Sequence, residues 1–434
     1  MILIRADANE HIGTGHVMRC LSIANAFVQA GHEVKFITAD HRGDGLIKSR
    51  GFESICLNSE WTQMEGEEIG SILRSYRPDL LLVDSYFVTE PYLSSISDSV
   101  TLAYLDDLNK ATWNLDFLIN YNIFGTVMDY SHYKETKTRL ILGPTYAPLR
   151  NEFKSVPQHK INDMKYVKNI MVSAGGADPE RITEKLIENV CDDLKDIVFH
   201  FIIGALNPRL EKIRALANEH KNVILHINVK NMTALMKSCD IAISAAGSTL
   251  YELCACGTPS ITYVLADNQL AAADEFERQG VMISAGDCRG NACFIPSLAE
   301  RLHELIGDKE KRSQLSVKMQ SLVDGCGAER MVGIIWEQIV SDAREALRDL
   351  DAVTVCRERN RRVVIGKAQN GRILIVENKL IDGKEIILHS SIANEEEVKI
   401  YNGAYRNENF SNVIPEFHRE ESCRESEKYQ RRQE

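Results

Sequence analysis

The feature that most constrains the fold is a repeated alternation of short apolar runs with amphipathic stretches, which restarts after a polar segment near residue 160. The apolar runs are near-continuous, which is typical of parallel strands that are buried on both faces. Strands that alternate with helices predict a doubly wound α/β domain. Two such series predict two α/β domains in tandem, and the 434 residues are also too many for one ordinary core.

The expected elements divide the chain into a first domain, residues 1–150, a linker, residues 151–165, and a second domain, residues 166–350. The first domain is expected to hold strands at Met1–Arg5, Val34–Thr38, 53–57, Leu80–Val83 and Val100–Leu105, with a helix from about Gly15 to Ala30. The second domain is expected to hold strands at Lys168–Ser173, Val198–Ile203, Asn222–Leu225, Ile241–Ser244 and Ser260–Val264. Residues 327–347 are expected to form a long closing helix.

The composition changes after about residue 352. A small β-rich appendage is predicted over residues 351–415, and residues 416–434 are charged and poor in large aliphatics, so we expect a disordered tail. The expected strands of the appendage are Arg361–Lys367, Arg372–Val376, Glu385–His389 and Glu397–Tyr401, with turns at Asn370-Gly371 and Asp382-Gly383.

Charge and cysteine usage argue against several classes of protein and site. The 51 basic and 62 acidic residues give a net charge of −11, which argues against a nucleic-acid partner. No apolar run approaches the roughly 18 residues of a membrane span, and Arg5 and Asp7 interrupt any signal peptide, so we expect a cytoplasmic protein with no membrane partner. The 11 scattered cysteines indicate reduced thiols and neither a disulfide framework nor a zinc site. The oligomeric state stays open.

The loop after the first strand carries the first candidate site. Gly13 and Gly15 let the backbone approach a ligand closely, and the helix that starts there points free amides at an anion. The interpretation of this loop as a dinucleotide-binding motif is weak, because Met18 occupies the position of the third glycine. His16 lies in the first helical turn, where the dipole favours an uncharged ring that can accept a proton from water. The alternative is a histidine that only caps or packs, but ligands of open α/β sheets bind at this edge.

Two loops of the second domain are candidate phosphate sites. Gly175 and Gly176 follow a strand and can bring amides to a phosphate, while Asp178 would otherwise only cap the next helix. The run Ile243–Leu253 also ends a strand in small residues, and Ser248-Thr249 opens a helix, so Gly247 and the two hydroxyl residues can hold a diphosphate. Glu252 can accept hydrogen bonds from ribose hydroxyls, or it can form a capping box with Thr249.

Polar residues after other strands are weaker candidates. Asn268 and Gln269 can recognise sugar hydroxyls or acetamido groups, or they can belong to an ordinary polar turn. Tyr86 follows a buried strand and can face the cleft. Asp106-Asp107 is either a carboxylate pair or a turn, and Asp349-x-Asp351 is a remote candidate for binding a metal–diphosphate.

Taken together, these motifs resemble those of a known family. In the same order, from residue 1 to about 345, they resemble the UDP-2,4-diacetamido-2,4,6-trideoxy-β-L-altropyranose hydrolases of pseudaminic acid biosynthesis. More distantly, the second half looks like the nucleotide domain of the N-acetylglucosaminyltransferase that makes the lipid-linked peptidoglycan precursor. The residues that carry the resemblance are Arg5-x-Asp7, Gly13-x-Gly15-His16-x-x-Arg19-Cys20, Ser173-Ala174-Gly175-Gly176-x-Asp178, Ala246-Gly247-Ser248-Thr249-x-x-Glu252, Asn268-Gln269 and Asp324-Gly325-x-Gly327-Ala328-x-Arg330.

The resemblance implies a GT-B architecture, in which two Rossmann-like domains enclose a substrate cleft and the C-terminal domain binds UDP. It implies that the partner is a UDP-linked diacetamido sugar, hydrolysed to UDP and free sugar without a metal or other cofactor. His16 is then the catalytic residue, and Tyr86 and Asn268 lie near the sugar. The expected substrate-binding residues are Gly13, Gly15, Arg19, Tyr86, Gly175, Gly176, Asp178, Gly247, Ser248, Thr249, Glu252, Asn268 and Gln269. The family does not need the appendage, whose role is left open.

The expected mechanism combines the two domains. His16 activates a water as general base, the amides around Gly247–Thr249 stabilise the departing diphosphate, and attack at the anomeric carbon inverts that centre. Three other functions remain possible. They are a glycosyltransferase of the same fold, a Rossmann dehydrogenase that binds NAD(P), and a sugar-nucleotide sensor without catalysis.

Overall fold

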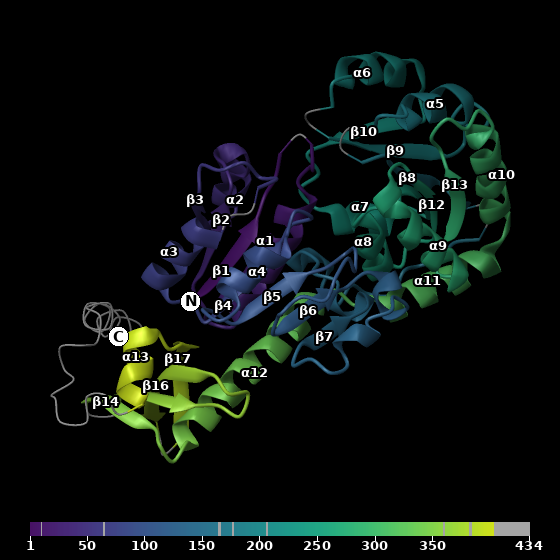
Figure 1. The fold of residues 1–434 in the computed structure, drawn as a ribbon. Helices are drawn as coiled ribbons and strands as arrows, with labels where there is room; N and C mark the ends of the chain where they lie inside the picture. Colours follow the sequence, from purple (N-terminus) through teal and green to yellow (C-terminus); the bar gives the residue numbers. More distant parts are fainter. Residues whose placement is uncertain are drawn as a thin grey trace, which may run out of the picture.

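The computed structural model describes residues 1–402 apart from 10, 64–65, 164–165, 176–177, 205–206, 359–360 and 382–383. Two parallel sheets and one small antiparallel sheet make up its three parts (Figure 1). The predicted turn at Asp382-Gly383 and the predicted tail 416–434 lie outside the described residues.

The first domain is a seven-stranded parallel sheet with the order β3-β2-β1-β4-β5-β6-β7. All five expected strands are present, and β6 and β7 are two short strands that the sequence analysis does not predict. The strands are β1 Ile2–Ala6, β2 Val34–Thr38, β3 Glu53–Cys56, β4 Leu80–Asp84, β5 Leu102–Leu105, β6 Phe117–Asn120 and β7 Arg139–Leu142. The helices are α1 Gly15–Gln29, α2 Asp44–Ser49, α3 Gly66–Tyr76 and α4 Glu90–Ile96.

The second domain repeats the plan in a six-stranded parallel sheet with the order β10-β9-β8-β11-β12-β13. Its five expected strands are confirmed, and β13 is additional. The strands are β8 Asn169–Ser173, β9 Val198–Ile203, β10 Val223–Ile227, β11 Ile241–Ala245, β12 Ser260–Val264 and β13 Ile283–Asp287. The helices are α5 Ile182–Asn189, α6 Leu210–Glu219, α7 Met232–Ser238, α8 Thr249–Cys256, α9 Leu270–Arg278, α10 Phe294–Gly307 and α11 Lys309–Leu322.

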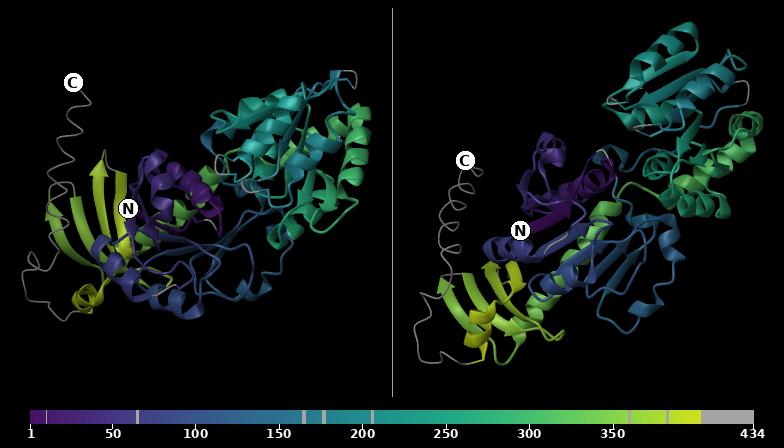
Figure 2. Two further views of the ribbon diagram at one scale, coloured as in Figure 1. Left: turned by 90° about the horizontal axis from the view of Figure 1, so that it is seen from above. Right: turned by 45° about the horizontal axis from the view of Figure 1, so that its top comes forward.

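The long helix α12, Gly327–Arg348, returns from the second domain to the first and packs against α1 (Figures 1 and 2). Met331 and Ile335 on its apolar face are fully buried in the same core as Ile23 of α1. The sequence analysis assigns this helix to the second domain, so its packing on the first is a finding of the structure.

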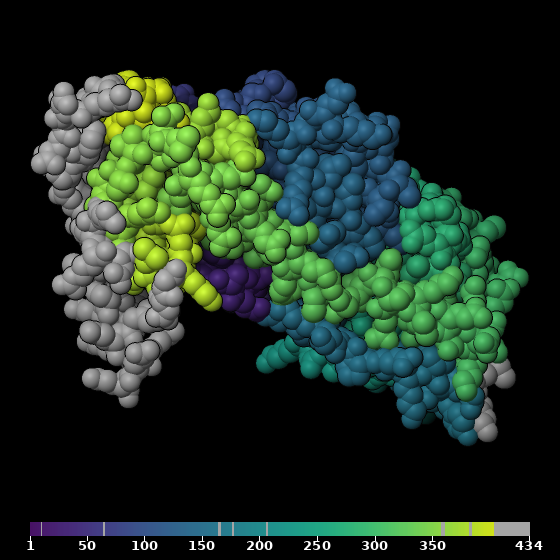
Figure 3. Space-filling view, turned by 90° about the horizontal axis from the view of Figure 1, so that it is seen from below, coloured from purple at the N-terminus to yellow at the C-terminus, as the bar shows by residue number. Residues whose placement is uncertain are grey.

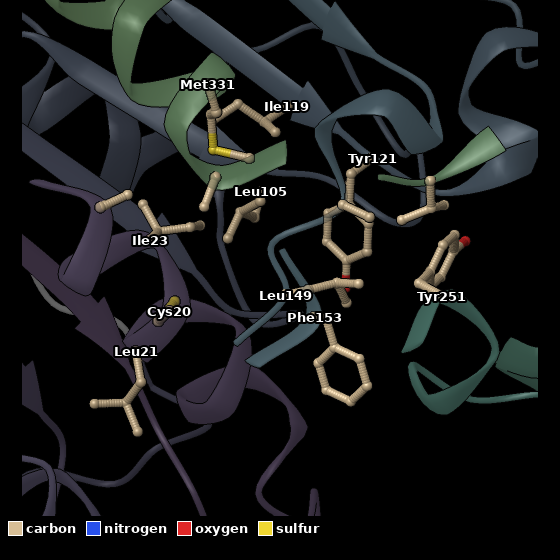
Figure 4. Packing of buried hydrophobic residues seen from close by; sticks show 14 of the residues in the cluster. Cys20, Leu21, Ile23, Leu105, Ile119, Tyr121, Leu149, Phe153, Tyr251 and Met331 are labelled. Carbon is tan, nitrogen blue, oxygen red and sulfur yellow. The ribbon is translucent and has the colours of Figure 1, made fainter. Parts of the chain in front are cut away.

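One hydrophobic core runs through both domains and the connection between them. Figure 4 shows Tyr121 of the first domain and Tyr251 of α8 close together, with Leu149 and Phe153 of the connecting segment beside them. The Tyr251 hydroxyl accepts a hydrogen bond from the Ile123 amide at 3.0 Å. The domains therefore meet through buried contacts next to the carboxyl ends of their strands.

The appendage is a four-stranded antiparallel sheet followed by a short helix. Its elements are β14 Val353–Glu358, β15 Arg361–Lys367, β16 Ile373–Ile381, β17 Lys384–Ile392 and α13 Glu395–Tyr401. The prediction of a strand at Glu397–Tyr401 is wrong. Asn394 and Glu397 form a capping box, and the acidic residues that follow Asn394 suit a helix N-terminus, which outweighs the β-like composition.

Ion pairs join the appendage to the first domain, and Figure 3 shows the two side by side. Arg77 forms two hydrogen bonds of 2.6 Å with Glu397, and Asp79 accepts one from the Ser390 amide at 2.8 Å. Arg372 pairs with Asp116. Because Arg77 and Asp79 precede β4 and Asp116 precedes β6, the appendage is anchored at the amino-terminal edge of the first sheet.

We expect Gly366→Ala to loosen the appendage from α12. A Cβ at Gly366 of β15 would lie 1.9 Å from the Ala346 carbonyl oxygen, so strand and helix would have to separate. Overpacking of this kind typically costs about 1–3 kcal/mol. Faster amide hydrogen exchange across β15 and β16 is the expected result. Gly333→Ala in α12 meets no atom within 4 Å and is the control; equal exchange in both variants would contradict the prediction.

Candidate active site

The candidate residues gather where parallel strands end. In the first domain, His16 in the first turn of α1, Asp84 at the end of β4, and Asp107 and Asn122 in the loops after β5 and β6 lie at one edge of the sheet. In the second domain, the loops after β8, β11 and β12 carry the three predicted ligand motifs. Ligands of open α/β sheets bind at such edges.

His16 and Asp84 form a buried pair. The His16 Nδ1 lies 2.6 Å from the Asp84 carboxylate, and its side chain is 8% exposed. An ionised carboxylate can only accept a hydrogen bond, so Nδ1 carries a proton towards Asp84, and Nε2 is the ring nitrogen that this bond leaves free. His16 also lines a small pocket that includes Ser85 and Tyr86. The ring is therefore in a position to take a proton from a molecule in that pocket.

Asp84 is held in its charged form. Burial alone would raise the pKa of its carboxyl, but the Arg19 guanidinium and then His16 hold that pKa well below its usual range. Arg19 donates from Nε and from Nη2 to the two Asp84 oxygens, each at 2.6 Å. The Cys20 thiol also contacts this carboxylate, and burial together with Asp84 raises the pKa of the thiol. The cysteine is thus an uncharged neighbour of the His16–Asp84 pair, which we call the dyad.

Arg19, which is predicted to bind substrate, bridges two carboxylates. Its Nη1 donates to Asp107 at 2.8 Å, while its other nitrogens hold Asp84. Of the two roles considered for Asp106-Asp107, turn and carboxylate site, each residue takes one. Asp106 accepts from the Leu108 and Asn109 amides as a turn residue, whereas Asp107 faces the site.

Asp107 connects the dyad to the second domain. It accepts hydrogen bonds from the Tyr86 hydroxyl at 3.1 Å and from the Asn122 amide nitrogen at 2.7 Å. The Asn122 amide oxygen in turn accepts from the Tyr251 hydroxyl at 3.3 Å. A continuous series of contacts therefore leads from Arg19 to the first turns of α8.

Tyr86 and Asn268 meet across the two domains, as candidate residues near one substrate should. The Tyr86 ring stands edge-on to the His16 ring with centroids 4.6 Å apart. Burial and then Asp107 raise the pKa of its hydroxyl, and the Asn268 side chain of the second domain lies near enough to oppose this. The tyrosine is therefore a neutral hydroxyl next to the dyad.

The two glycines of the first loop have open space around them. Gly13 has φ +70°, a conformation that favours glycine, and no atom lies within 4 Å of the Cβ position at Gly13 or Gly15. The Asn9 side chain accepts from the His11 and Ile12 amides at 2.9 and 3.0 Å and shapes the loop. The loop therefore leaves open space in front of the helix N-terminus.

The predicted diphosphate loop opens α8, with Ser248 as its N-cap. The Gly247 amide donates to the Ala245 carbonyl at 2.8 Å, so it is engaged in a tight turn. The amides of Ser248 and Thr249 stand in the first turn, where helix geometry provides no internal acceptor. The amides of this loop without a helical acceptor are thus those of Ser248 and Thr249, and Gly247 supplies the turn.

Glu252 forms an ion pair with the connecting segment and no capping box. Its carboxylate accepts from Arg150 Nη2 at 2.9 Å, and Ser248 makes no side-chain cap of α8. Burial raises the pKa of Glu252, which Arg150 opposes. Arg150 also pairs with Glu152, which accepts hydrogen bonds from the amides that open α7. Glu252, the predicted partner of the ribose, is therefore held in place by Arg150.

The other predicted residues of the second domain have mainly structural contacts. Gly175 has φ +72° and open space around its Cβ position, and Gly176 lies outside the described residues. Asp178 is buried and its carboxylate caps α5 through the Ile182 and Thr183 amides, which is the alternative considered for it. Gln269 accepts from the Leu265 amide at 2.9 Å.

Other features lie away from this site. Asp349 accepts hydrogen bonds from the Asp351 and Lys367 amides and from the Tyr401 hydroxyl, which explains that motif as a support of the appendage. Within the described ranges, no group of three or more His, Cys, Asp or Glu residues could hold a metal ion. No helix in the same part of the chain is long and apolar enough to cross a membrane.

Several residues of the site escape the sequence analysis. Asp84 belongs to a buried strand end and pairs with His16 across 68 positions of sequence. Asn122 follows the unpredicted strand β6, and Arg150 lies at the boundary assigned to the linker. The sequence offers one signal for such residues, a polar residue directly after an apolar run, and this signal marks Asp84 and Asp107.

Comparisons with known proteins identify relatives of this chain. Residues 169–324 match the Glycosyltransferase family 28 C-terminal domain. The UDP-2,4-diacetamido-2,4,6-trideoxy-beta-L-altropyranose hydrolase of Campylobacter jejuni is 25% identical over 283 residues, which are 64% of this chain and 97% of that protein. The predicted resemblance to this hydrolase family is confirmed.

Two further relatives extend the comparison. The spore coat polysaccharide biosynthesis protein SpsG of Bacillus subtilis is 26% identical over 337 residues, which cover 76% of this chain and 96% of that protein. The uncharacterized protein MJ1062 of Methanocaldococcus jannaschii is 27% identical over 279 residues, 62% of this chain, but the match spans only 56% of its length.

The fold is GT-B, as the sequence predicts. The crystal structure of MurG from Acinetobacter baumannii has a TM-score of 0.55 at 12% identity and covers 77% of this chain and 99% of that one. The fold class of two Rossmann-like domains with a small C-terminal β appendage is therefore confirmed.

Proposed function

We propose that this protein hydrolyses a UDP-linked diacetamido sugar to UDP and the free sugar, with His16 as general base. The observation that carries the proposal is the His16–Asp84 pair at 2.6 Å, which lines a pocket beside the contact between the two domains. The names of the hydrolase relatives support the choice of substrate class.

In the proposed reaction, Nε2 of His16 takes a proton from a water molecule as the water oxygen attacks the anomeric carbon. The bond from that carbon to the diphosphate oxygen breaks, and its electron pair leaves with UDP, so the anomeric centre is inverted. General-base catalysis of this kind contributes about 10²–10⁴-fold. Asp84 keeps the imidazole in the tautomer that this step needs.

The second domain stabilises the leaving group in this proposal. The Ser248 and Thr249 amides at the start of α8 donate to the diphosphate, where negative charge develops. Glu252 accepts hydrogen bonds from the ribose, and Asn268 and Tyr86 contact the sugar from opposite domains. Because the leaving diphosphate is already a weak base, the reaction needs no strong general acid. The proposed reaction proceeds without a metal and in the cytoplasm.

The decisive assay incubates the protein with a UDP-diacetamido sugar and water as the only acceptor. We expect stoichiometric UDP release, with the first-formed free sugar carrying the inverted anomeric configuration in an NMR time course. Release that needs an added acceptor would indicate a glycosyltransferase, and binding without turnover would indicate a sensor. Competition by NAD(P) in place of UDP would indicate a dehydrogenase.

A further inference from the structure

The base and the leaving-group site of the proposed reaction belong to different domains. His16 lies on α1 of the first domain, whereas the Ser248 and Thr249 amides lie at the start of α8 in the second. A water held by the base reaches the anomeric carbon only if the separation of these groups is fixed, since a misplacement of about 1 Å can cost about 10²-fold in rate. The contacts that hold α8 against the first domain therefore bear on the rate.

Tyr251, in the first turn of α8, makes such contacts. Its hydroxyl accepts a hydrogen bond from the Ile123 amide at 3.0 Å and donates one to the Asn122 amide oxygen at 3.3 Å. Its ring stands edge-on to the Tyr121 ring, with centroids 5.6 Å apart, and Figure 4 shows both rings where the domains meet. Both hydrogen bonds of this buried hydroxyl cross from the second domain to the first.

The hydrogen bonds of Asn122 make this contact directional. Its side-chain nitrogen donates to Asp107 at 2.7 Å and to Asn120 at 2.9 Å. Both N–H groups are then engaged, so the amide oxygen is the atom that faces Tyr251 and accepts the proton of its hydroxyl. Because the Ile123 amide donates to the same hydroxyl, one tyrosine oxygen is held between two groups of the first domain.

The residues that Tyr251 contacts also support the dyad. The Tyr121 hydroxyl accepts a hydrogen bond from Arg19 Nη1 at 3.2 Å, and Asp107 accepts one from the same nitrogen at 2.8 Å. Arg19 in turn donates to Asp84 at 2.6 Å. The start of α8 is therefore joined by directional contacts to the part of the first domain that carries the proposed base.

We propose that Tyr251 is a positioning residue, whose hydroxyl sets the separation between the base of the first domain and the leaving-group amides of α8. The inference rests on the proposed function, because that function assigns the base and the leaving group to different domains. Tyr251 touches neither the water nor the sugar and acts through the placement of α8. Without its hydroxyl, the Asn122 oxygen and the Ile123 amide lose a buried partner, and the start of α8 can shift.

The test removes only this hydroxyl, since Tyr251→Phe keeps the ring against Tyr121. Tyr133→Phe is the matched control, because the buried Tyr133 hydroxyl accepts from the Trp113 amide at 2.8 Å and donates to the Ala111 carbonyl at 3.3 Å, all within the first domain. With a UDP-diacetamido sugar, we expect Tyr251→Phe to lower kcat by about tenfold or more. Its dissociation constant for UDP, measured by calorimetry, should stay at the wild-type value.

Tyr133→Phe should retain the wild-type kcat although both variants lose a buried hydrogen bond, and both are assayed below their melting temperatures. Equal kcat values for Tyr251→Phe and Tyr133→Phe would overturn the inference and leave the hydrolase proposal standing. A loss of UDP affinity that accounts for the whole loss of activity would make Tyr251 a support of the nucleotide site and would likewise overturn it.

The pH dependence of kcat separates positioning from an effect on the base. Tyr251→Phe should keep the limbs of the wild-type profile at the same pH, because the hydrogen bonds within the dyad and between Arg19 and Asp84 are unaltered. A limb that moves in Tyr251→Phe but not in Tyr133→Phe would mean that the hydroxyl acts on the ionisation of the dyad, and the inference would be wrong. A wild type that releases no UDP removes the proposed function and this inference with it.

Discussion

Replacing His16 with asparagine is expected to lower kcat by about 10²–10⁴-fold while UDP binds as before. Asparagine can still donate a hydrogen bond to Asp84, as the His16 Nδ1 does at 2.6 Å, but it cannot take a proton from water. UDP contacts are assigned to the second domain, so its dissociation constant should not change. Steady-state UDP release and calorimetry with UDP measure the two quantities separately.

His132→Asn is a matched control, because His132 is exposed in a short 3-10 helix of the same domain. It should leave both kcat and UDP affinity at the wild-type values. Unchanged turnover in His16→Asn would remove His16 from the role of base. A loss of UDP affinity together with turnover would instead indicate that the variant disturbs the contact between the domains.

The sequence predicts most of the fold because buried parallel strands are continuous apolar runs. Strands β9 and β12 are predicted to the residue, since apolar runs with clear boundaries form them. Strand β13 contains a serine, a glycine with φ +82° and an aspartate, so its composition does not resemble a buried strand. The strand predicted at the position of helix α13 is wrong, because a capping box at Asn394 decides the conformation of this segment.

The candidate site could be predicted only in part, because its chemistry depends on pairs that are distant in sequence. His16 is found because it lies in a glycine loop at a strand end. Its partner Asp84 and the bridging Arg19 depend on which strands are neighbours, and the pairing of β1 with β4 is a property of the sheet. The same holds for the approach of Asn268 to Tyr86, which exists only once the domains are placed together.

Asp84→Asn is expected to lower kcat by a factor similar to that of His16→Asn. An asparagine side chain can donate its own N–H to Nδ1, which favours the tautomer that has its proton on Nε2 and cannot act as a base. The depressed pKa of Asp84 means that the wild-type carboxylate is ionised at all working pH values, so it does not produce the acid limb of the rate profile. Wild-type pH–rate profiles should therefore show no ionisation in the usual pKa range of an aspartate that belongs to Asp84.

The variant should also be less stable at neutral pH. A carboxyl group whose folded pKa is depressed stabilises the fold above its unfolded pKa, and this stabilisation is lost as pH falls through the folded value. Removing the charge leaves Arg19 with Asp107 as its carboxylate partner, and breaking a buried pair costs about 3–5 kcal/mol. Thermal denaturation must therefore be followed beside activity, with the exposed Asp98→Asn as control.

The double variant His16→Asn/Asp84→Asn decides whether the two residues act as one unit. If Asp84 acts only through the His16 ring, the double variant should lose no more activity than His16→Asn alone, because groups that work together are strongly non-additive. If the two losses multiply, Asp84 has a separate effect on the substrate or on the contact with Arg19. Equal kcat values for the double variant and His16→Asn, at temperatures where both are folded, make Asp84 a positioning residue for the base.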